Sequence, residues 1–286
     1  MTIHDILNQA VHDFETAGIP SARLDAEVLL SFYLQCDRLE FLKNPAMEIN
    51  DSQVTGFRNI VSRRIKWEPV AYITGRKEFW SLLLEVNKEV LIPRPDTEVL
   101  VEETLKICRQ TDSPEINILD IGTGSGAIVI ALASELPQAK FTATDISEAA
   151  LNLARGNANN LGFGKRIDFR KGDLLEPVDS LFDVIVSNPP YISAQDYENL
   201  PAGVRDYEPP EALLAGKTGW EFYAKLIYQA PEYLQKNGWL LMEIGAKQEK
   251  PVRELLDGSG FFDSVNMRRD YAGLPRVIKA RRNSSG

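Results

Sequence analysis

The sequence predicts an α/β protein: a mostly parallel sheet with helices on both faces, preceded by a small all-helical part. Two observations carry this prediction. Residues 1–75 show apolar side chains at helical spacing, whereas from residue 116 short apolar runs alternate with helical segments. Such alternation is typical of strand–helix–strand crossovers, which build parallel sheets.

The composition is ordinary for a globular protein, with 44% apolar and 26% charged residues among 286. The net charge of −9 gives no general footprint for nucleic acid. The N-terminus lacks a basic segment followed by an apolar stretch, and no run reaches the ~18 apolar residues of a spanning helix. We therefore expect a cytoplasmic protein that neither acts at membranes nor binds nucleic acid directly.

Cysteine and histidine are scarce. Cys36 and Cys108 stand alone, which is typical of reduced thiols in the cytosol. The histidines are His4 and His12, both near the N-terminus. A histidine-dependent triad or a metal site is therefore not expected in the large C-terminal part.

Residues 1–75 are interpreted as a helical bundle that binds or orients a partner, because they contain no glycine-rich loop and no obvious carboxylate pair. The helix that begins near Asp51 places Arg58, Arg63 and Arg64 on its expected outer face. A solvated helix face is the ordinary explanation of such a charge run. Contacts with an acidic partner surface are the more specific hypothesis.

Residues 76–95 are predicted to form a β-hairpin linker, with its turn at residues 87–88 and a strand at 90–92. Two prolines follow in the segment 93–98, where regular structure is excluded. Asp96 is a candidate N-cap for the next helix.

Residues 96–282 form the predicted α/β domain. Apolar runs predict its strands, at residues 116–121, 141–145, 167–170, 183–187, 239–244, 261–267 and 275–281. A polar loop spans about 192–218, and loops of this length are usually functional or mobile.

The turn Asn188-Pro189-Pro190-Tyr191 follows a buried strand, so it lies where open α/β sheets bind ligands. The prolines stiffen the turn and lack N–H groups, which leaves backbone carbonyls free to accept hydrogen bonds. Asn188 adds a side-chain amide, and Tyr191 adds an aromatic face. Such a site can hold a planar –NH2 group, although the pattern alone is also compatible with a simple strand-ending turn.

A glycine-rich turn joins the first parallel strand to its helix, and its residues are Gly122, Thr123, Gly124, Ser125 and Gly126. Its backbone can approach a ligand closely. Asp145 ends the second strand, where an acid can accept the two ribose hydroxyls of a nucleotide cofactor. Because Gly122, Gly124 and Ala127 also fit the dinucleotide pattern, NAD is a competing cofactor.

Two observations favour S-adenosylmethionine over NAD. Asp120 directly precedes the turn, where it would repel a pyrophosphate but tolerate a cationic ligand. The Asn-Pro-Pro-Tyr turn suits an amine or amide, and no histidine is placed for hydride transfer. Asp173 or Leu174, after the third strand, is then expected beside the adenine.

Taken together, these motifs resemble the S-adenosylmethionine-dependent methyltransferases that act on amino groups. Adenine-amine DNA methyltransferases and protein glutamine methyltransferases share the Asn-Pro-Pro-Tyr form. Further segments resemble the release factor glutamine methyltransferase (PrmC/HemK) family specifically, so that the resemblance covers essentially the whole chain. These segments are Gly75 through Trp80, residues 92–98, residues 120–126, Tyr207-Glu208-Pro209 and Ala212-Leu213.

The resemblance implies a seven-stranded, Rossmann-like methyltransferase sheet with a small helical N-terminal domain. It also implies methylation of the glutamine side-chain amide in the Gly-Gly-Gln motif of peptide-chain release factors. The implied catalytic and substrate-binding residues are Asn188, Pro189, Pro190 and Tyr191. The implied cofactor-binding residues are 122–126, Asp145, Asp173, Leu174 and Asn188. We expect a monomer whose residues 1–75 dock the substrate.

A DNA adenine methyltransferase is the main alternative, because it would use the same four residues on a flipped base. It would need a basic cleft, which the net charge of −9 and the short helical part argue against. A nicotinamide oxidoreductase and a non-enzymatic adaptor are the remaining alternatives. The adaptor leaves the glycine turn and the Asn-Pro-Pro-Tyr turn unexplained together.

Overall fold

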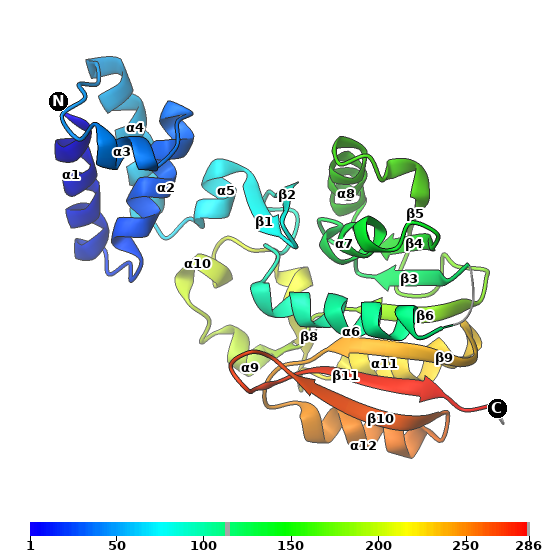
Figure 1. Cartoon of the computed structure of the whole chain (residues 1–286). Coiled ribbons are helices and arrows are strands. Elements are labelled where there is room, and N and C mark those ends of the chain that lie inside the picture. Colours follow the sequence, from blue (N-terminus) through cyan, green and yellow to red (C-terminus); the bar gives the residue numbers. More distant parts are fainter. Residues whose placement is uncertain (112–114, 285–286) are drawn as a thin grey trace. The chain divides into compact units, whose positions relative to one another are not determined.

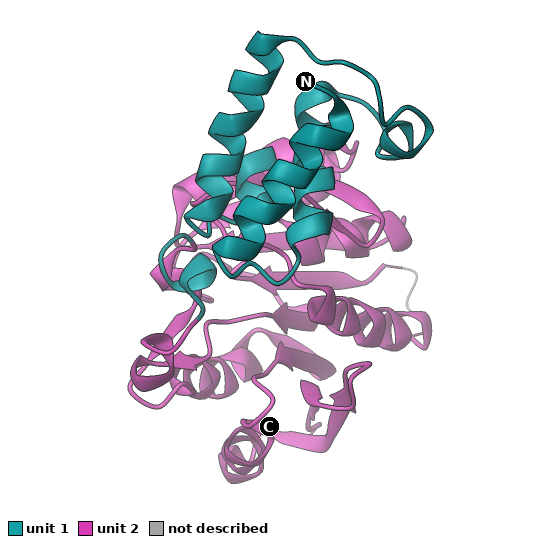
Figure 2. Ribbon diagram, turned by 90° about the vertical axis from the view of Figure 1, so that its left-hand side faces the viewer, with its two compact units in different colours: residues 1–76, 201–207 teal, residues 77–200, 208–286 magenta. Residues whose placement is uncertain are grey.

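The structure is a computed structural model that describes residues 1–111 and 115–284. Its chain forms two compact units, which Figure 2 shows in different colours. The first contains residues 1–76 and 201–207, and the second contains residues 77–200 and 208–286.

The first unit is helical. Its elements are α1 (Ile3–Thr16), α2 (Ala22–Leu34), α3 (Leu39–Lys43), α4 (Asp51–Ile65), α5 (Val70–Thr74) and, from the later segment, α10 (Ala202–Arg205). Thr2 and Asp5 form a capping box that starts α1, and Asn50 caps α4. The apolar faces of α1, α2 and α4 meet in a core where Phe14 and Phe57 are fully buried.

The expected outer position of Arg64 is wrong. Its Nε donates to Asp25 Oδ2 at 2.8 Å, and both side chains are about one-tenth exposed. Removing one partner of such a buried pair would leave an uncompensated charge. Arg63 pairs with Glu68 at the surface, and Arg58 is exposed. Arg58 and Arg63 therefore remain as candidate contacts on this helix.

The remaining elements follow in chain order. They are β1 (Arg76–Phe79), β2 (Leu82–Glu85), η1 (Pro95–Thr97), α6 (Glu98–Arg109), β3 (Asn117–Ile121), α7 (Ala127–Glu135), β4 (Lys140–Asp145), α8 (Glu148–Asn160), η2 (Gly164–Arg166), β5 (Ile167–Lys171), β6 (Phe182–Ser187), β7 (Ile192–Ser193), α9 (Ala194–Tyr197), η3 (Pro210–Ala212), β8 (Leu214–Gly216), α11 (Glu221–Gln229), η4 (Ala230–Glu232), β9 (Leu234–Glu243), α12 (Glu249–Ser259), β10 (Phe262–Arg269) and β11 (Pro275–Arg282).

The β-hairpin is present, but its turn lies at Trp80-Ser81 and not at residues 87–88. Both turn residues have positive φ, 53° and 56°, which a two-residue hairpin turn requires. The Trp80 N–H donates to Glu98 Oε1 at 2.9 Å, and its indole N–H donates to Glu135 at 3.0 Å. Contacts with α6 and α7 therefore hold a turn that has no glycine or asparagine to mark it.

Two further expectations for the linker are wrong. Residues 90–92 form no strand. Asp96 does not cap α6, which begins at Glu98 after a 3-10 turn without a side-chain cap. The Asp96 carboxylate, which was expected to cap the helix, instead forms an ion pair with Arg276 at 3.0 Å.

The second unit contains the predicted sheet of seven strands, in the order β10-β11-β9-β6-β3-β4-β5 (Figure 1). The strands β9, β6, β3, β4 and β5 are parallel. β11 runs antiparallel to both β9 and β10. The sequence-based prediction of a mostly parallel α/β fold is therefore confirmed.

β3 shows how the sheet is buried on both faces. Ile118 packs with residues of α6 and α7, whereas Leu119 and Ile121 pack on the other face with residues of α11 and α12. All three side chains are at most 1% exposed. The loops at the carboxyl ends of the strands therefore extend from a rigid scaffold.

The expected polar loop contains short elements: β7, α9, α10, η3 and β8. Its segment 201–207 belongs to the first unit. There the Tyr207 hydroxyl donates to the Lys66 carbonyl at 2.8 Å, and a Cβ on Gly203 would lie 2.9 Å from the Trp67 carbonyl oxygen. This segment is thus packed against the end of α4.

Candidate active site

The carboxyl ends of β3 and β6 lie side by side. Ile121 pairs with Ser187 in parallel register, and the Ser187 hydroxyl donates to the Ile121 carbonyl at 2.8 Å. The glycine turn follows β3, and the Asn-Pro-Pro-Tyr turn follows β6. Because the chain continues to β4 on one side of β3 and to β6 on the other, this is the topological switch point, where open α/β sheets bind ligands.

The glycine turn presents bare backbone to open space. Gly122 and Gly124 have φ of 70° and 55°, and a Cβ on either would meet no atom within 4 Å. Gly126, with φ of 83°, is different, since a Cβ there would lie 2.8 Å from a side chain of α7. Thr123 and Ser125 are buried. Of the five predicted residues, the turn therefore offers mainly backbone, and not hydroxyl groups, to a ligand.

Two acids flank this turn. Asp120 is fully buried, and burial raises its pKa to about 7. Its Oδ2 accepts from the Thr123 hydroxyl at 2.7 Å, while its Oδ1 makes no hydrogen bond within the described part of the chain. Asp145 accepts from the N–H groups of Gly124 and Ser147, both at 2.9 Å, and burial raises its pKa. Each Asp145 oxygen keeps a lone pair that a hydroxyl could use.

The segment of Asp173 and Leu174 lies beside the end of β4. The Thr144 hydroxyl donates to the Leu174 carbonyl at 3.1 Å, and the Gly172 N–H donates to the Asp145 carbonyl at 3.1 Å. Leu174 has φ of 49°, an uncommon conformation for leucine. The structure thus brings the predicted adenine-side residues to the same edge as the glycine turn.

Asn157 of α8 braces the glycine turn, and no motif in the sequence marks this role. Its Nδ2 donates to the carbonyls of Ser125 and Glu85, both at 2.9 Å, and its Oδ1 accepts from the Glu85 N–H at 2.8 Å. The side chain is 2% exposed. It therefore joins the turn to the β1–β2 hairpin.

The Asn-Pro-Pro-Tyr turn is held from both ends. The Asn188 Nδ2 donates to Thr97 Oγ1 at 3.3 Å, and the Tyr191 carbonyl accepts from Gln248 Nε2 at 2.8 Å. Asn188, Pro190 and Tyr191 are half-buried. Burial raises the pKa of the Tyr191 hydroxyl to about 12, so this group remains protonated at neutral pH.

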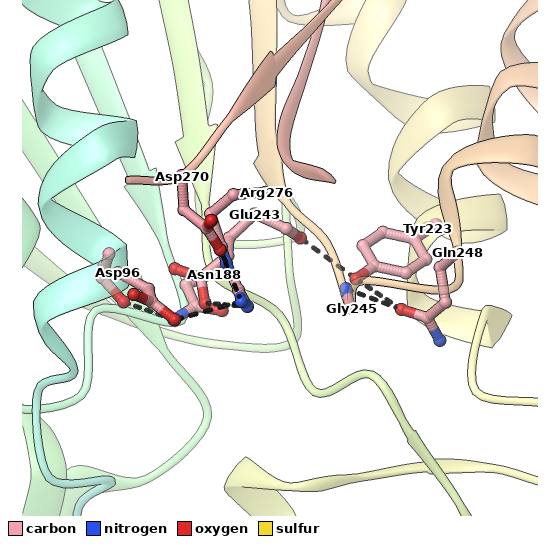
Figure 3. A network of polar contacts seen from close by, with 9 residues as sticks. Asp96, Asn188, Tyr223, Glu243, Gly245, Gln248, Asp270 and Arg276 are labelled. Carbon is pink, nitrogen blue, oxygen red and sulfur yellow. Dashed lines mark hydrogen bonds and ion pairs between the residues drawn. The ribbon is translucent and has the colours of Figure 1, made fainter. Parts of the chain in front are cut away.

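Charged residues behind the turn form a network that the sequence-based site did not include (Figure 3). Glu243 ends β9 with 1% exposure, and burial raises its pKa to about 7. Arg276 lies 4.0 Å from Glu243 Oε1 and pairs with Asp270 and Asp96 at 3.1 and 3.0 Å. A carboxylate at the end of an apolar strand is the one sequence signal that points to Glu243.

A shallow hollow of about 520 Å³ lies at the opposite, amino-terminal edge of β3 and β4. Two of its three lining cations are engaged: Lys140 pairs with Glu115 at 2.7 Å, and Arg166 donates to backbone carbonyls. Within residues 1–111 and 115–284, no three metal-ligating side chains gather at one place. The predicted site residues lie at the opposite, carboxyl edge of the sheet.

Comparisons with known proteins agree with this geometry. A family model described as the PrmC N-terminal domain matches residues 5–75, and one described as a methyltransferase domain matches residues 112–257. The release factor glutamine methyltransferase of Geobacter sulfurreducens is 41% identical over 281 residues, which are 98% of this chain and 96% of that protein. The protein of the same name from Moorella thermoacetica is 40% identical over 283 residues, which are 99% of each chain.

This chain belongs to the release factor glutamine methyltransferase family. Its methyltransferase domain is S-adenosylmethionine-dependent. Among solved structures, the hMettl16 catalytic domain in complex with MAT2A 3'UTR hairpin 1 matches with a TM-score of 0.59 at 18% identity, over 84% of this chain and 83% of that one. A methyltransferase from Pyrococcus furiosus matches with a TM-score of 0.53 at 22% identity, over 79% and 98%. These two likenesses show the fold.

The residues of this family member fit S-adenosylmethionine. The unpartnered, buried Asp120 oxygen can meet a cationic group, which removes the cost of leaving that acceptor unsatisfied. The open backbone at Gly122 and Gly124 admits close approach, and Asp145 can accept from ribose hydroxyls. These assignments of individual residues remain predictions.

Proposed function

We propose that this chain transfers a methyl group to the side-chain amide nitrogen of the glutamine in the Gly-Gly-Gln motif of peptide-chain release factors. Family membership supports the reaction and the substrate class. The single observation that carries the site is the placement of Asn188 at the switch point, with its amide nitrogen engaged inward by Thr97. Its oxygen is thereby left for a substrate.

The amide nitrogen of glutamine is a poor nucleophile, because its lone pair is delocalised into the carbonyl. Asn188 Oδ1 and the Pro189 carbonyl would accept its two N–H groups and so fix the nitrogen for methyl transfer. Fixed acceptors also stabilise positive charge that develops on nitrogen. Alignment of this kind can lower a barrier by up to about 7–11 kcal/mol. S-adenosylmethionine supplies the methyl group when bound.

Tyr191 would cover the amide plane and not act as a base. Its hydroxyl has a pKa of about 12, so the phenolate is scarce at neutral pH. No base need act before methyl transfer, because the N-methylated, positively charged amide loses its proton readily. The role of Tyr191 is therefore packing and orientation.

The helical unit would dock the rest of the release factor, with exposed Arg58 and surface Arg63 as candidate contacts. Within the described residues, no helix has the length and apolar character to cross a bilayer. The free thiols of Cys36 and Cys108 support a cytoplasmic location. We also expect a monomer, which light scattering of the purified protein would check.

A methyl-transfer assay with labelled S-adenosylmethionine tests the proposal. The acceptors are a release factor, the same factor with the glutamine of Gly-Gly-Gln replaced, and duplex DNA. Label on the unmodified factor alone supports the proposal. Label on DNA would favour the adenine-amine alternative, which shares the four-residue turn.

A further inference from the structure

The Asn188 side chain begins a line of polar contacts that leads into the protein interior. Its Nδ2 donates to Thr97 Oγ1 at 3.3 Å, and interaction with the Thr97 hydroxyl lowers the pKa of the buried Glu243 carboxylate, although burial raises it overall. Thr97 is 4% exposed and Glu243 is 1% exposed. β6 and β9 are neighbours, with Ser187 paired to Met242, so Asn188 and Glu243 each lie one residue beyond that pair.

The hydroxyl of Thr97 determines which way the Asn188 amide faces. A threonine hydroxyl has one hydrogen, and an ionised carboxylate such as that of Glu243, whose pKa the Thr97 hydroxyl lowers, can only accept that hydrogen. The oxygen of Thr97 can then only accept from Asn188, so the NH2 group must face Thr97. Asn188 Oδ1 is therefore turned away, where a substrate amide can donate to it.

Glu243 sets this direction because an ionised carboxylate accepts hydrogen bonds and cannot donate. Its other contacts do not compete strongly: Arg276 stays 4.0 Å away and is held by Asp270 and Asp96. Glu243 Oε2 makes no hydrogen bond within the described residues. The negative charge is thus directed at Thr97.

We propose that Glu243 and Thr97 are positioning residues that fix the Asn188 amide with its oxygen toward the substrate and increase the negative charge on that oxygen. The inference rests on the proposed function, in which the substrate amide donates to Asn188 Oδ1. Aligned hydrogen bonds polarise one another. The anion at the inner end therefore strengthens the acceptor at the outer end, where positive charge develops on the substrate nitrogen.

The first test removes the hydroxyl. Thr97→Val keeps the shape and should lower kcat by roughly 10- to 100-fold, less than the 10²–10³ typical of deleting a direct contact. Thr97→Ser keeps the hydroxyl and should restore most of the rate. Thr104→Val is the matched control, because Thr104 of α6 is also buried and its hydroxyl donates to the Leu100 carbonyl of its own helix. Its kcat should equal that of the unmodified protein.

The second test measures coupling. In Glu243→Gln the side-chain amide can donate as well as accept. The Thr97 hydroxyl is then no longer forced to donate to position 243, so the Asn188 amide is no longer fixed and kcat should fall. The double variant with Thr97→Val should be no slower than Thr97→Val alone, since both changes break one line. Glu103→Gln is the control. Glu103, like Glu243, is a buried glutamate, but it lies on α6.

The outcomes separate the inference from the proposed function. An unmodified protein that does not methylate release factor would contradict the proposed function. With an active unmodified protein, Thr97→Val that retains kcat, or that loses only S-adenosylmethionine affinity by calorimetry, overturns the inference. Independent, multiplicative losses in the double variant also overturn it. If Thr97→Val fails to fold, a normal kcat in folded Glu243→Gln would overturn the inference instead.

Discussion

Asn188 follows β6 and donates its side-chain N–H to Thr97, so the proposed chemistry depends on its side-chain oxygen. Asn188→Ala removes the acceptor, so we predict that kcat falls by about 10²–10³-fold. The S-adenosylmethionine dissociation constant should change little, because the glycine turn and Asp145 stay intact. Steady-state kinetics and calorimetry measure the two quantities. Unchanged turnover would exclude the proposed role.

If Glu243 positions Asn188 as proposed, we expect the reaction to depend on pH. Its pKa is raised to about 7, so the carboxylate takes up a proton as the pH falls through that value and can then donate to Thr97. We predict that kcat at saturating S-adenosylmethionine falls between about pH 8 and about pH 6. The charged and titratable groups facing Glu243 are Arg276, Asp96, Arg94, Tyr191 and Tyr223.

The control for this pH profile is Glu243→Gln, which cannot ionise. Its kcat should be low and nearly flat across the same range. A profile with the same inflection as that of the unmodified protein would assign the titration to another group. Saturating cofactor is needed because Asp120, with a pKa also about 7, would act on cofactor affinity.

Sequence reasoning at the residue scale found the residues that lie in local motifs and missed their partners. Asn188 and the glycine turn follow apolar strands, so their place at the sheet edge could be predicted. Thr97 contacts Asn188 across 91 positions of sequence, and the Tyr191 contact of Gln248 spans 57. Contacts between such distant positions carry no periodicity that a single sequence reveals.

At the scale of elements, most buried strands were predicted within a residue or two, but β9 begins at Leu234 and not at residue 239, and the hairpin turn was misplaced. The strand expected at 141–145 is Lys140–Asp145, because an apolar run buried on both faces has sharp limits. Trp80 and Ser81 adopt positive φ under the constraint of contacts with α6 and α7. Tertiary contacts here override the local preference of these residue types.

Gln248 joins three segments around the site, so its substitution tests whether these contacts support the site. It donates to the carbonyls of Tyr191 and Gly219 at 2.8 and 3.0 Å and accepts from the Gly245 N–H and the Tyr223 hydroxyl. Gln248→Glu keeps the acceptor but turns a carboxyl oxygen toward two carbonyls. We predict a loss of kcat and a fall of about 1–3 kcal/mol in the free energy of unfolding.

Tyr223→Phe provides the comparison for Gln248→Glu. It removes one hydroxyl from the same network but leaves the bond between Gln248 and the Tyr191 carbonyl. Urea unfolding should show a loss of stability, while kcat should stay near that of the unmodified protein. Equal kcat losses in both variants would mean that the network acts only through stability.

At the scale of the whole molecule, two buried carboxyls link stability to pH. The pKa values of Asp120 and Glu243 are raised to about 7 in the folded state, above their ordinary values of 3.8 and 4.5. Between about pH 4 and about pH 7 the folded state therefore binds more protons than the unfolded state. The free energy of unfolding should decrease as the pH rises through this window and level off above it.

Asp120→Asn isolates one part of this effect. Raising the pKa from 3.8 to about 7 corresponds to at most about 4 kcal/mol, so the variant should lose much of the slope. Carboxyls with lowered pKa, such as Asp270, act in the opposite sense only below about pH 4. Denaturant titrations of Asp120→Asn and of the unmodified protein at about pH 5 and about pH 8 would measure how the free energy of unfolding changes with pH. Identical slopes in the two proteins would contradict the assignment to Asp120.

The segment 201–207 has a consequence for the ancestry of the protein. It lies in sequence between β7 and β8 of the methyltransferase unit but packs with the helical unit, so the chain passes between the units three times. Neither unit is one continuous stretch of gene. A recombination event that exchanged residues 1–76 alone would separate Tyr207 from its Lys66 partner. An exchange of residues 1–76 alone would therefore have to place a backbone carbonyl where that of Lys66 now accepts from Tyr207.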